Sequence, residues 1–433
     1  MAALARAAQP RANVAILRRL ALEDFRSYAS AELRPNPGLT VVSGPNGAGK
    51  TNLLEAIFVA ITGRSHRAVT DAELVRIGSP FARVRLELAS LPGVTTVELV
   101  LPGATPPPGL RKRLTVNGVP RRASSVTEVA RAVLFRPEEM MLLVGPPSDR
   151  RRFLDGILAQ RDRRVARDLA DLGRVVAQRN ALLRAIRAEE ADLGALAFWD
   201  EQLATIGARV MLARRGLVAE LDRRIDTFHA AVVEDADSVD DRDTDADMTG
   251  RAGSRSLRLA YMDTLKEAWP GRDEARLPTP DELTAAFRTR IADIRQKEAW
   301  NGVSLVGPQR DDLRVELGGR DVALHASRGQ QRTLILALKL VETELLAEDG
   351  PRPLILLDDV FSELDPRRAR RLAALLEGRG QVIVTTADPR ALRSVAAHDT
   401  PPWNIEAGLL IAPYAGHRPV NGDAAANSRM PGD

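Results

Sequence analysis

The sequence predicts an α/β fold into which a long helical arm is inserted, and three observations carry this prediction. The last third alternates helical patterns with apolar strands, which is typical of a parallel sheet covered by helices. In the first third, an apolar strand at 39–43 leads through a glycine-rich loop into an apolar helix at 50–62. Between these regions, from about Asp149 to Val233, proline is absent and leucine, alanine and arginine recur at helical spacing. The two ends of the chain are therefore expected to form one head.

Strand patterns surround the first apolar strand. Residues 15–33 suggest two strands joined by a turn, and apolar alternation resumes at 81–101. Turns at Pro92-Gly93 and at 102–109 break this second stretch into antiparallel strands. The first third is therefore predicted to contain a mixed sheet.

The helical stretch is expected to fold back on itself as an arm. Two limbs of about 40 residues, at 1.5 Å per residue, would extend roughly 60 Å. Its heptads are imperfect, so packed helices and a coiled coil both remain open. A helical pattern returns at 280–299.

The last third is predicted to complete the head. Its expected elements are, in order, strands at 304–306, 313–317 and 322–324, a helix at 330–348, a strand at 354–357, a helix at 366–377 and a strand at 381–385.

The resulting organisation has five parts. They are a flexible lead (1–14), the first part of the head (15–150), an inserted helical arm (151–300), the second part of the head (301–412) and a flexible tail (413–433). Within the arm, residues 235–255 hold seven aspartates and almost no large apolar side chain, which predicts a disordered insert. A divalent-ion site is the alternative, but the carboxylates lack the spacing of a calcium loop.

Composition narrows the functional classes. The chain has 433 residues, 44% of them apolar and 28% charged, which is typical of a globular protein of two or three domains. There is no cysteine, which excludes disulfides and thiolate chemistry, and five scattered histidines make a zinc site improbable. No apolar run of about 18 residues and no signal-like start is seen, so we expect a cytoplasmic protein without membrane spans. The high pI, near 9.7, rests largely on arginine and is weak evidence for nucleic acid.

The glycine-rich loop predicts a nucleoside triphosphate site. It fits the pattern G-x-x-x-x-G-K-[ST] and lies between a strand and a helix, as a phosphate-binding loop must. Backbone N–H groups and the helix N-terminus would face the phosphates, Lys50 would add a charge, and the Thr51 hydroxyl would reach Mg²⁺. A glycine-rich surface turn is the alternative. The residues expected to contact the nucleotide are Gly44, Pro45, Asn46, Gly47, Ala48, Gly49, Lys50, Thr51 and Asn52.

A second motif is an apolar strand that ends in two carboxylates, Asp358 and Asp359, in the manner of a Walker B element. Asp358 is predicted to hold Mg²⁺ and Asp359 to orient the attacking water as a general base. Lys50 and Asp359 are thus the predicted catalytic residues. A buried strand that ends in a capped turn is the alternative.

A third motif opens the helix that precedes this strand. Ser327, Gly329 and Gln330 could offer N–H and hydroxyl groups to a phosphate, although a plain helix cap would look the same. Its order and distance relative to Asp358 favour the functional interpretation.

Together these motifs resemble those of the ATP-binding-cassette class, whose signature serine and glycine contact a nucleotide held by a second subunit. Within that class the chain resembles the RecF family of bacterial recombination mediators, in the SMC-like group, over roughly residues 16–400. The segments that carry the resemblance are 25–28, 50–56, 63–67, 135–138, 145–155, 327–333 and 357–365. One departure is Gln309, at a position where the family usually has histidine.

The resemblance implies an ATPase head of the ATP-binding-cassette type and a slow, DNA-dependent ATPase that uses ATP and Mg²⁺. It also implies an ATP-dependent homodimer that clamps gapped duplex or double-strand to single-strand junctions, without sequence specificity. By the same resemblance the role is recombinational repair, replication restart and the SOS response, with RecR and RecO as partners and RecA loaded indirectly. The expected location is then the cytoplasm, at the nucleoid.

Sequence-independent DNA binding would need cationic side chains that contact phosphate. The candidates are Arg64, Arg67, Arg111, Lys112, Arg113, Arg121 and Arg122, for which a solvated surface is the alternative. Two other functions compete. A chromosome-organising ATPase would need a much longer arm, and a transporter ATPase subunit would have a switch histidine after the last core strand, where Thr385-Thr386-Ala387-Asp388 stands.

Overall fold

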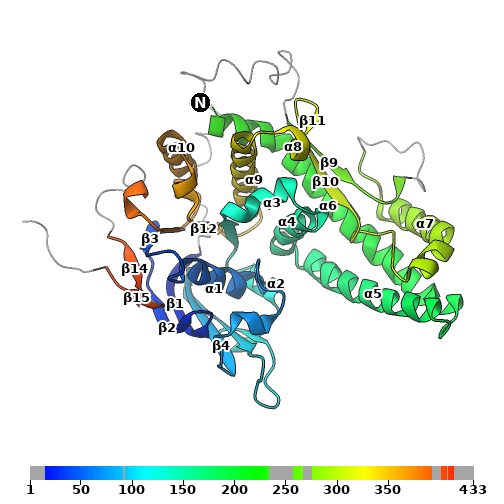
Figure 1. Ribbon diagram of the computed structural model, residues 1–433, viewed down its shortest axis with the longest axis horizontal. Coiled ribbons are helices and arrows are strands. Elements are labelled where there is room, and N and C mark those ends of the chain that lie inside the picture. Colours follow the sequence, from blue (N-terminus) through cyan, green and yellow to red (C-terminus); the bar gives the residue numbers. More distant parts are fainter. Residues whose placement is uncertain are drawn as a thin grey trace, which may run out of the picture.

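The computed structural model describes residues 15–90, 93–233, 257–266, 276–392, 401–406 and 408–413, and the structural statements below concern these residues. A head built on two sheets carries a helical arm that projects to one side (Figure 1). The predictions for 1–14, for 235–255 and for nearly all of 413–433 lie outside the described residues. No helix in the described part of the chain is long and apolar enough to cross a membrane.

One sheet of the head is antiparallel, in the order β2-β1-β4-β5-β6-β7. Its long strands alternate buried and more exposed side chains, as expected when one face packs on a core. The strands are β1 (Ile16–Phe25), β2 (Tyr28–Leu33), β4 (Phe81–Ser90), β5 (Gly93–Pro102), β6 (Arg113–Val116) and β7 (Val119–Pro120).

The other large sheet has the order β15-β14-β3-β13-β12-β8, and all neighbours except β15 and β14 are parallel. Its central strands are apolar and buried along their length, as strands covered on both faces are. The strands are β3 (Leu39–Ser43), β8 (Ala132–Phe135), β12 (Leu354–Asp358), β13 (Val382–Thr386), β14 (Trp403–Glu406) and β15 (Leu409–Ile411).

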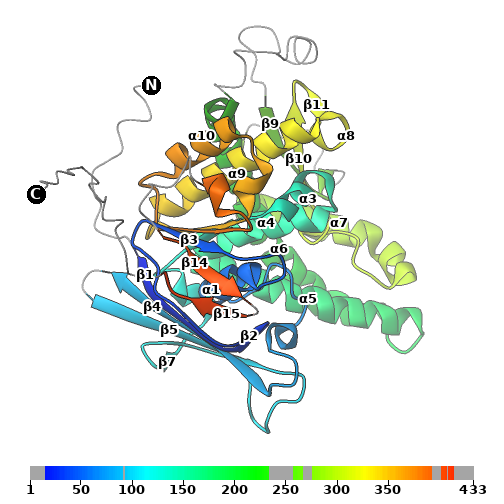
Figure 2. The same cartoon turned by 60° about the vertical axis from the view of Figure 1, so that its left-hand side comes forward.

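Helix α1 (Lys50–Thr62) lies between the two sheets (Figure 2). Its Leu53 and Ile57 share one core with Leu86 of β4 and Leu356 of β12. The opposite face of the parallel sheet is covered by α9 (Arg328–Glu348) and α10 (Pro366–Leu376), whose buried residues belong to a second core.

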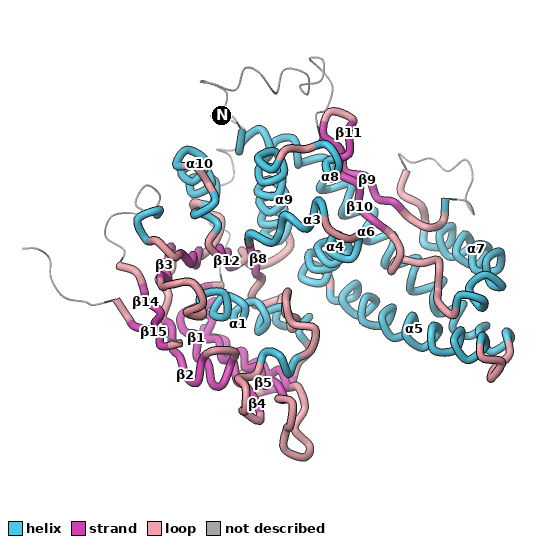
Figure 3. Tube along the Cα trace, viewed as in Figure 1, coloured by secondary structure: helices cyan, strands magenta, loops and turns pink. Residues whose placement is uncertain are grey.

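The arm consists of packed helices (Figure 3). It contains α4 (Pro147–Arg161), α5 (Arg163–Arg187), α6 (Ala197–Val233) and α7 (Pro280–Asn301). The limbs α5 and α6 have 25 and 37 residues, so the expected length of about 40 residues is confirmed for α6 and wrong for α5. At 1.5 Å per residue, α5 extends only roughly 38 Å.

Helix α6 belongs to both the arm and the head. Its first half packs against α7, where Gly207 lies close to Phe287. Its second half, including Leu217, Leu221 and Phe228, joins the core beneath α9. The arm therefore begins inside the head instead of at a linker.

A small sheet lies at this junction, in the order β11-β10-β9. Its strands are β9 (Leu257–Met262), β10 (Asp312–Leu317) and β11 (Arg320–Asp321). The short helices of the chain are α2 (Ala123–Val126), α3 (Met141–Val144), α8 (Val322–His325), η1 (Asp71–Leu74), η2 (Pro137–Met140), η3 (Leu193–Leu196), η5 (Val360–Glu363) and η6 (Pro389–Leu392).

Two expectations need correction. Residues 304–306 are not a strand, because Ser304 is held by side chains of the arm, including Asn180 and Arg179. Residues 322–324 form helix α8, whose first turn is capped by the Asp321 carboxylate.

Candidate nucleotide-binding site

The phosphate loop joins β3 to α1, and its glycines are required by close contacts. Gly49 has φ 116°, and a Cβ there would lie 2.8 Å from the Ser27 hydroxyl. At Gly44 a Cβ would lie 2.5 Å from the carbonyl oxygen of Ile405 in β14. Glycine alone satisfies both constraints, which leaves the backbone free to curve toward a phosphate.

Lys50 curls back over the loop that precedes it. Its Nζ donates to the carbonyl oxygens of Gly44, at 2.7 Å, and Pro45, at 3.0 Å, and the side chain is largely buried. An ammonium held by the loop in this way places a positive charge where a triphosphate would bind.

The turn between β1 and β2 supports the loop from below. The Tyr28 hydroxyl donates to the carbonyl oxygen of Gly49 at 2.9 Å, and the Asn52 side-chain amide donates to Ser27 at 2.9 Å. Burial raises the pKa of Tyr28, which keeps the phenol protonated as a donor. Asn52, which is predicted to contact the nucleotide, therefore connects the start of α1 to this turn through its hydrogen bond with Ser27.

Glu55 organises the cationic side chains beside α1. Its buried carboxylate accepts from Arg26 at 3.0 and 3.1 Å, from Arg67 at 2.6 Å and from Ser65 at 2.6 Å. Burial alone would raise its pKa, but the two guanidinium groups and the hydroxyl outweigh this and hold the pKa of Glu55 at about 2. Sequence analysis assigned no role to Glu55, although it lies in a motif that carried the family resemblance.

Asp358 ends β12 next to the phosphate loop. It accepts a hydrogen bond from Thr385 of β13 at 2.7 Å, and the hydroxyl of Thr51 lies close enough to affect its pKa. Burial raises the pKa of Asp358, the two hydroxyls lower it, and the carboxylates of Glu138 and Asp359 raise it again. A hydroxyl near a buried carboxylate is a donor set that suits Mg²⁺. The two predicted metal ligands, from opposite ends of the chain, therefore meet.

Asp359 has a strained backbone and a free carboxylate oxygen. Its φ of 52° is unusual for a residue other than glycine, and its N–H donates to the Thr385 carbonyl oxygen at 3.1 Å. Among the described residues, its buried Oδ1 has no hydrogen-bond partner. An unpaired buried oxygen beside Asp358 is available to bind a water molecule.

The signature residues form the N-terminus of α9. Ser327 Oγ accepts from the N–H of Gln330 at 3.2 Å, and Gln330 Oε1 accepts from the N–H of Ser327 at 2.9 Å. Ser327 is exposed, and α8 just before it lies away from α1 in both views of the molecule (Figures 1 and 2). Lys50, Thr51, Asp358 and Asp359 thus gather at one place, whereas the signature residues lie elsewhere on the head.

The segment 145–155, which carried part of the resemblance, meets the segment around Gln309 at the root of the arm. Arg150 of α4 contacts both oxygens of Asp312 at 2.6 and 2.9 Å, and Arg214 of α6 donates to the Pro308 carbonyl oxygen at 2.6 Å. Burial raises the pKa of Asp311 to about 7, although the Tyr261 hydroxyl donates to it at 2.6 Å. The segment around Gln309 therefore joins head and arm and is not part of the phosphate site.

The candidate DNA contacts divide into paired and unpaired cations. Arg67 pairs with Glu55, and Lys112 pairs with Asp71 at 2.8 Å. Arg64, just after α1, is exposed and has no ion pair among the described residues. The antiparallel pairing of β6 with β7 brings Arg111 and Arg113 to the same end of this hairpin as Arg121 and Arg122. These four arginines are exposed and have no ion pair among the described residues, and we refer to them as the hairpin patch: Arg111, Arg113, Arg121 and Arg122.

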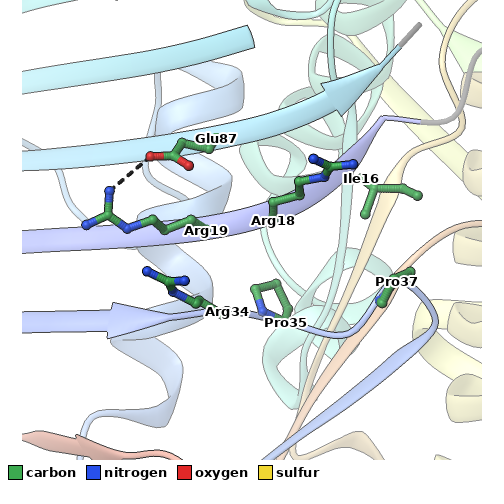
Figure 4. Close-up of a pocket in the computed structure, with 7 residues that line it drawn as sticks. All are labelled: Ile16, Arg18, Arg19, Arg34, Pro35, Pro37 and Glu87. Carbon is green, nitrogen blue, oxygen red and sulfur yellow. Dashed lines mark hydrogen bonds and ion pairs between the residues drawn. The ribbon is translucent and has the colours of Figure 1, made fainter. Parts of the chain in front are cut away.

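A pocket of about 490 Å³ lies at the opposite end of the β1–β2 hairpin from the turn that supports the phosphate loop (Figure 4). Two of its arginines are paired, because Arg19 contacts Glu87 at 2.9 Å and Glu32 at 2.6 Å, and Arg34 contacts Glu32 at 2.8 Å. None of the predicted site residues lines it. The lining residues are Ile16, Arg18, Arg19, Arg34, Pro35, Pro37 and Glu87.

Comparison with known proteins gives one consistent family. Residues 16–399 match the family described as RecF/RecN/SMC N terminal domain. The DNA replication and repair protein RecF of Paenarthrobacter aurescens is 38% identical over 86% of this chain and 93% of its own length, and that of Kineococcus radiotolerans is 39% identical over 86% and 92%. A solved structure of the recombination mediator protein RecF-ATPrS in the RecFOR pathway has a TM-score of 0.77 and 26% identity, covering 92% of this chain and 98% of that one.

The cluster around Glu55 predicts a pH-dependent contribution to stability. Because the pKa of Glu55 falls from 4.5 to about 2 on folding, Glu55→Gln should lower the free energy of unfolding at pH 7 by about 3 kcal/mol. The difference from the unchanged chain should be complete above pH 4.5 and should shrink as the pH falls toward 2. Urea unfolding at several pH values measures it.

The matched control is Glu98→Gln, which removes a solvent-exposed ion pair with Arg85 of the neighbouring strand. This change should cost little, because exposed ion pairs contribute only about 0.2–1 kcal/mol. Equal losses in the two variants would contradict the role of Glu55.

Proposed function

The chain belongs to the RecF family of DNA replication and repair proteins, and from that membership we propose that it is an ATP-dependent DNA-binding protein of recombinational repair. In this proposal ATP closes a head-to-head dimer on gapped duplex or on a junction of double and single strands. The observation that carries it is the closeness of Thr51 to Asp358 beside the phosphate loop, combined with an exposed signature cap at Ser327.

The separation of the signature residues from the phosphate loop supports a dimer. Ser327 and Gly329 stand at the N-terminus of a 21-residue helix, where backbone N–H groups favour an anion. A nucleotide bound at Gly44–Thr51 of one copy could then contact Ser327 to Gln330 of a second copy. ATP would stabilise the dimer because it contacts both surfaces, and loss of the γ-phosphate would remove those contacts.

The residues of the site suggest how hydrolysis would proceed. Lys50 would neutralise charge on the β- and γ-phosphates, and Thr51 with Asp358 would hold Mg²⁺, which supplies further charge neutralisation when bound. Asp359 would hold the attacking water through its unpaired Oδ1 and accept its proton. An aspartate is one methylene shorter than a glutamate, so we propose slow turnover that suits a timed clamp.

The hairpin patch supports the proposed DNA binding. Four unpaired guanidinium groups on one hairpin can contact phosphates without reading sequence. By membership in the family, the partners would be RecR and RecO, and the outcome would be loading of RecA on single-stranded gaps. The proposed location is the cytoplasm, at the nucleoid.

The two rival functions rest on weaker observations. A chromosome-organising ATPase would need coiled coils of hundreds of residues, whereas the limbs here have 25 and 37. A transporter ATPase subunit would need a histidine where Thr386 to Asp388 follow β13. Neither rival explains the match to RecF proteins over most of their length.

The dimer is tested by sedimentation of the purified chain with ADP, with ATP, and with ATP plus gapped duplex. We expect a dimer only with ATP, and its loss in both Lys50→Met and Ser327→Arg, because each variant removes one side of the shared nucleotide site. Ser327→Arg should retain ATP binding by the monomer. A monomer under all conditions would refute the clamp.

The role of Asp359 is tested by Asp359→Asn. ATP turnover should fall by about 10²–10⁴-fold, the usual contribution of a general base, while the ATP-bound dimer persists. Steady-state phosphate release and sedimentation measure the two effects, and thermal unfolding checks that the variant is folded. Unchanged turnover, or turnover as fast as that of motor ATPases, would exclude this role.

The hairpin patch is tested by changing Arg111, Arg113, Arg121 and Arg122 together to glutamine. DNA affinity should fall equally for unrelated sequences, and the slope of log K against log salt should decrease by about 0.9 for each phosphate that the variant no longer neutralises. The control is Arg83→Gln with Arg85→Gln, because both arginines lie in the same sheet but pair with Glu23 and Glu98. Similar losses in control and test would argue against a specific patch.

A further inference from the structure

Two short helices beside the signature motif expose apolar side chains. Helices α3 and α8 contact each other and the region where α9 begins. They bury Leu142, Leu143 and Val322 in the core of the head. The two helices expose three apolar residues, which we refer to as the signature-flank patch: Met141 (47% exposed), Val144 (44%) and Leu324 (78%).

The backbone fixes this exposure. Asp321 caps α8 by accepting from the N–H of Ala323 at 2.9 Å, and Val322 is anchored in the core, so Leu324 faces outward. Gly145 ends α3 in a tight turn, where a Cβ would lie 2.4 Å from the Met141 carbonyl oxygen. Single exposed apolar residues are common, but three on two adjoining helical turns form a patch that calls for an explanation.

Two further apolar side chains, Val69 and Ile77, are 91% and 98% exposed on the segment that follows α1. This segment is tied to the site, because Arg67 donates to Asn52 at 2.6 Å and Arg26 donates to the Glu73 carbonyl oxygen at 2.7 Å. We call Val69 and Ile77 the loop-side patch.

We propose that the signature-flank patch of one copy packs on the loop-side patch of a second copy. This inference rests on the proposed dimer, in which Ser327 faces the phosphate loop of the partner. Leu324 precedes Ser327 by three residues, so a surface that covers Ser327 must also approach Leu324. Because a two-fold dimer repeats every contact, both patches of both copies become covered.

The size of the patches explains why they would not hold the dimer alone. Five apolar side chains fall short of the roughly 1,200–2,000 Å² that a stable interface buries. The apolar contact therefore adds to the contacts of ATP and cannot replace them. Dimerisation remains conditional on the nucleotide, while the apolar contact strengthens the closed state.

The test is Leu324→Asp in the full-length chain, with ATP and Mg²⁺ present. The dissociation constant of the dimer should rise by about 100-fold, because a buried charge is introduced twice, whereas ATP binding by the monomer should be unchanged. The matched control is Trp300→Asp, since Trp300 is 82% exposed at the end of α7 in the arm. This variant should dimerise normally. Sedimentation and a fluorescent ATP analogue measure the two properties.

A charge pair identifies the contact itself. Ile77→Lys combined with Leu324→Asp should recover a large part of the dimer affinity, because the opposite charges would meet across the interface. If the unchanged chain dimerises and Leu324→Asp has no effect, the patch inference is refuted and the clamp stands. Absence of a dimer in the unchanged chain refutes both.

Discussion

The parallel pairing of β13 between β3 and β12 is the constraint on which the site depends. It sets Thr385 beside Val42 on one side and Asp358 on the other. The phosphate loop follows β3 and the paired aspartates end β12, so both emerge at the carboxyl edge of one sheet. Thr51 and Asp358 can therefore lie close to each other although the whole arm separates them in sequence.

Most of the head could be predicted because local patterns and tertiary structure agree there. The strand at 39–43, the helix at 50–62 and the strands around 81–101 are where apolar periodicity placed them. The α/β class and the resemblance to RecF proteins were also correct. The glycines at 44 and 49 helped to predict the phosphate loop, because neighbouring backbone and side-chain atoms leave no room for a Cβ at either position.

The errors arose where nonlocal contacts decide the structure. The segment Val322 to Leu324 is apolar and begins with a β-branched residue, which favours a strand. It forms a helical turn because the Asp321 carboxylate caps it and because Val322 is the one residue of the three that is buried. The first limb of the arm was overestimated because Asp162, which ends α4 and caps α5, divides that stretch into two helices. Glu55 was overlooked because its partners, Arg26 and Arg67, come from separate loops.

Helix α6 links the arm to the signature motif in a way that limits how either can move. Residues Leu203 and Leu221 of this one helix belong to the arm core and to the head core, respectively. The head half of α6 packs on α9, whose N-terminus carries Ser327. Close-packed cores resist sliding, so a shift of α9 toward a bound nucleotide must carry the arm with it. Closure of the proposed dimer would therefore change the position of both arms.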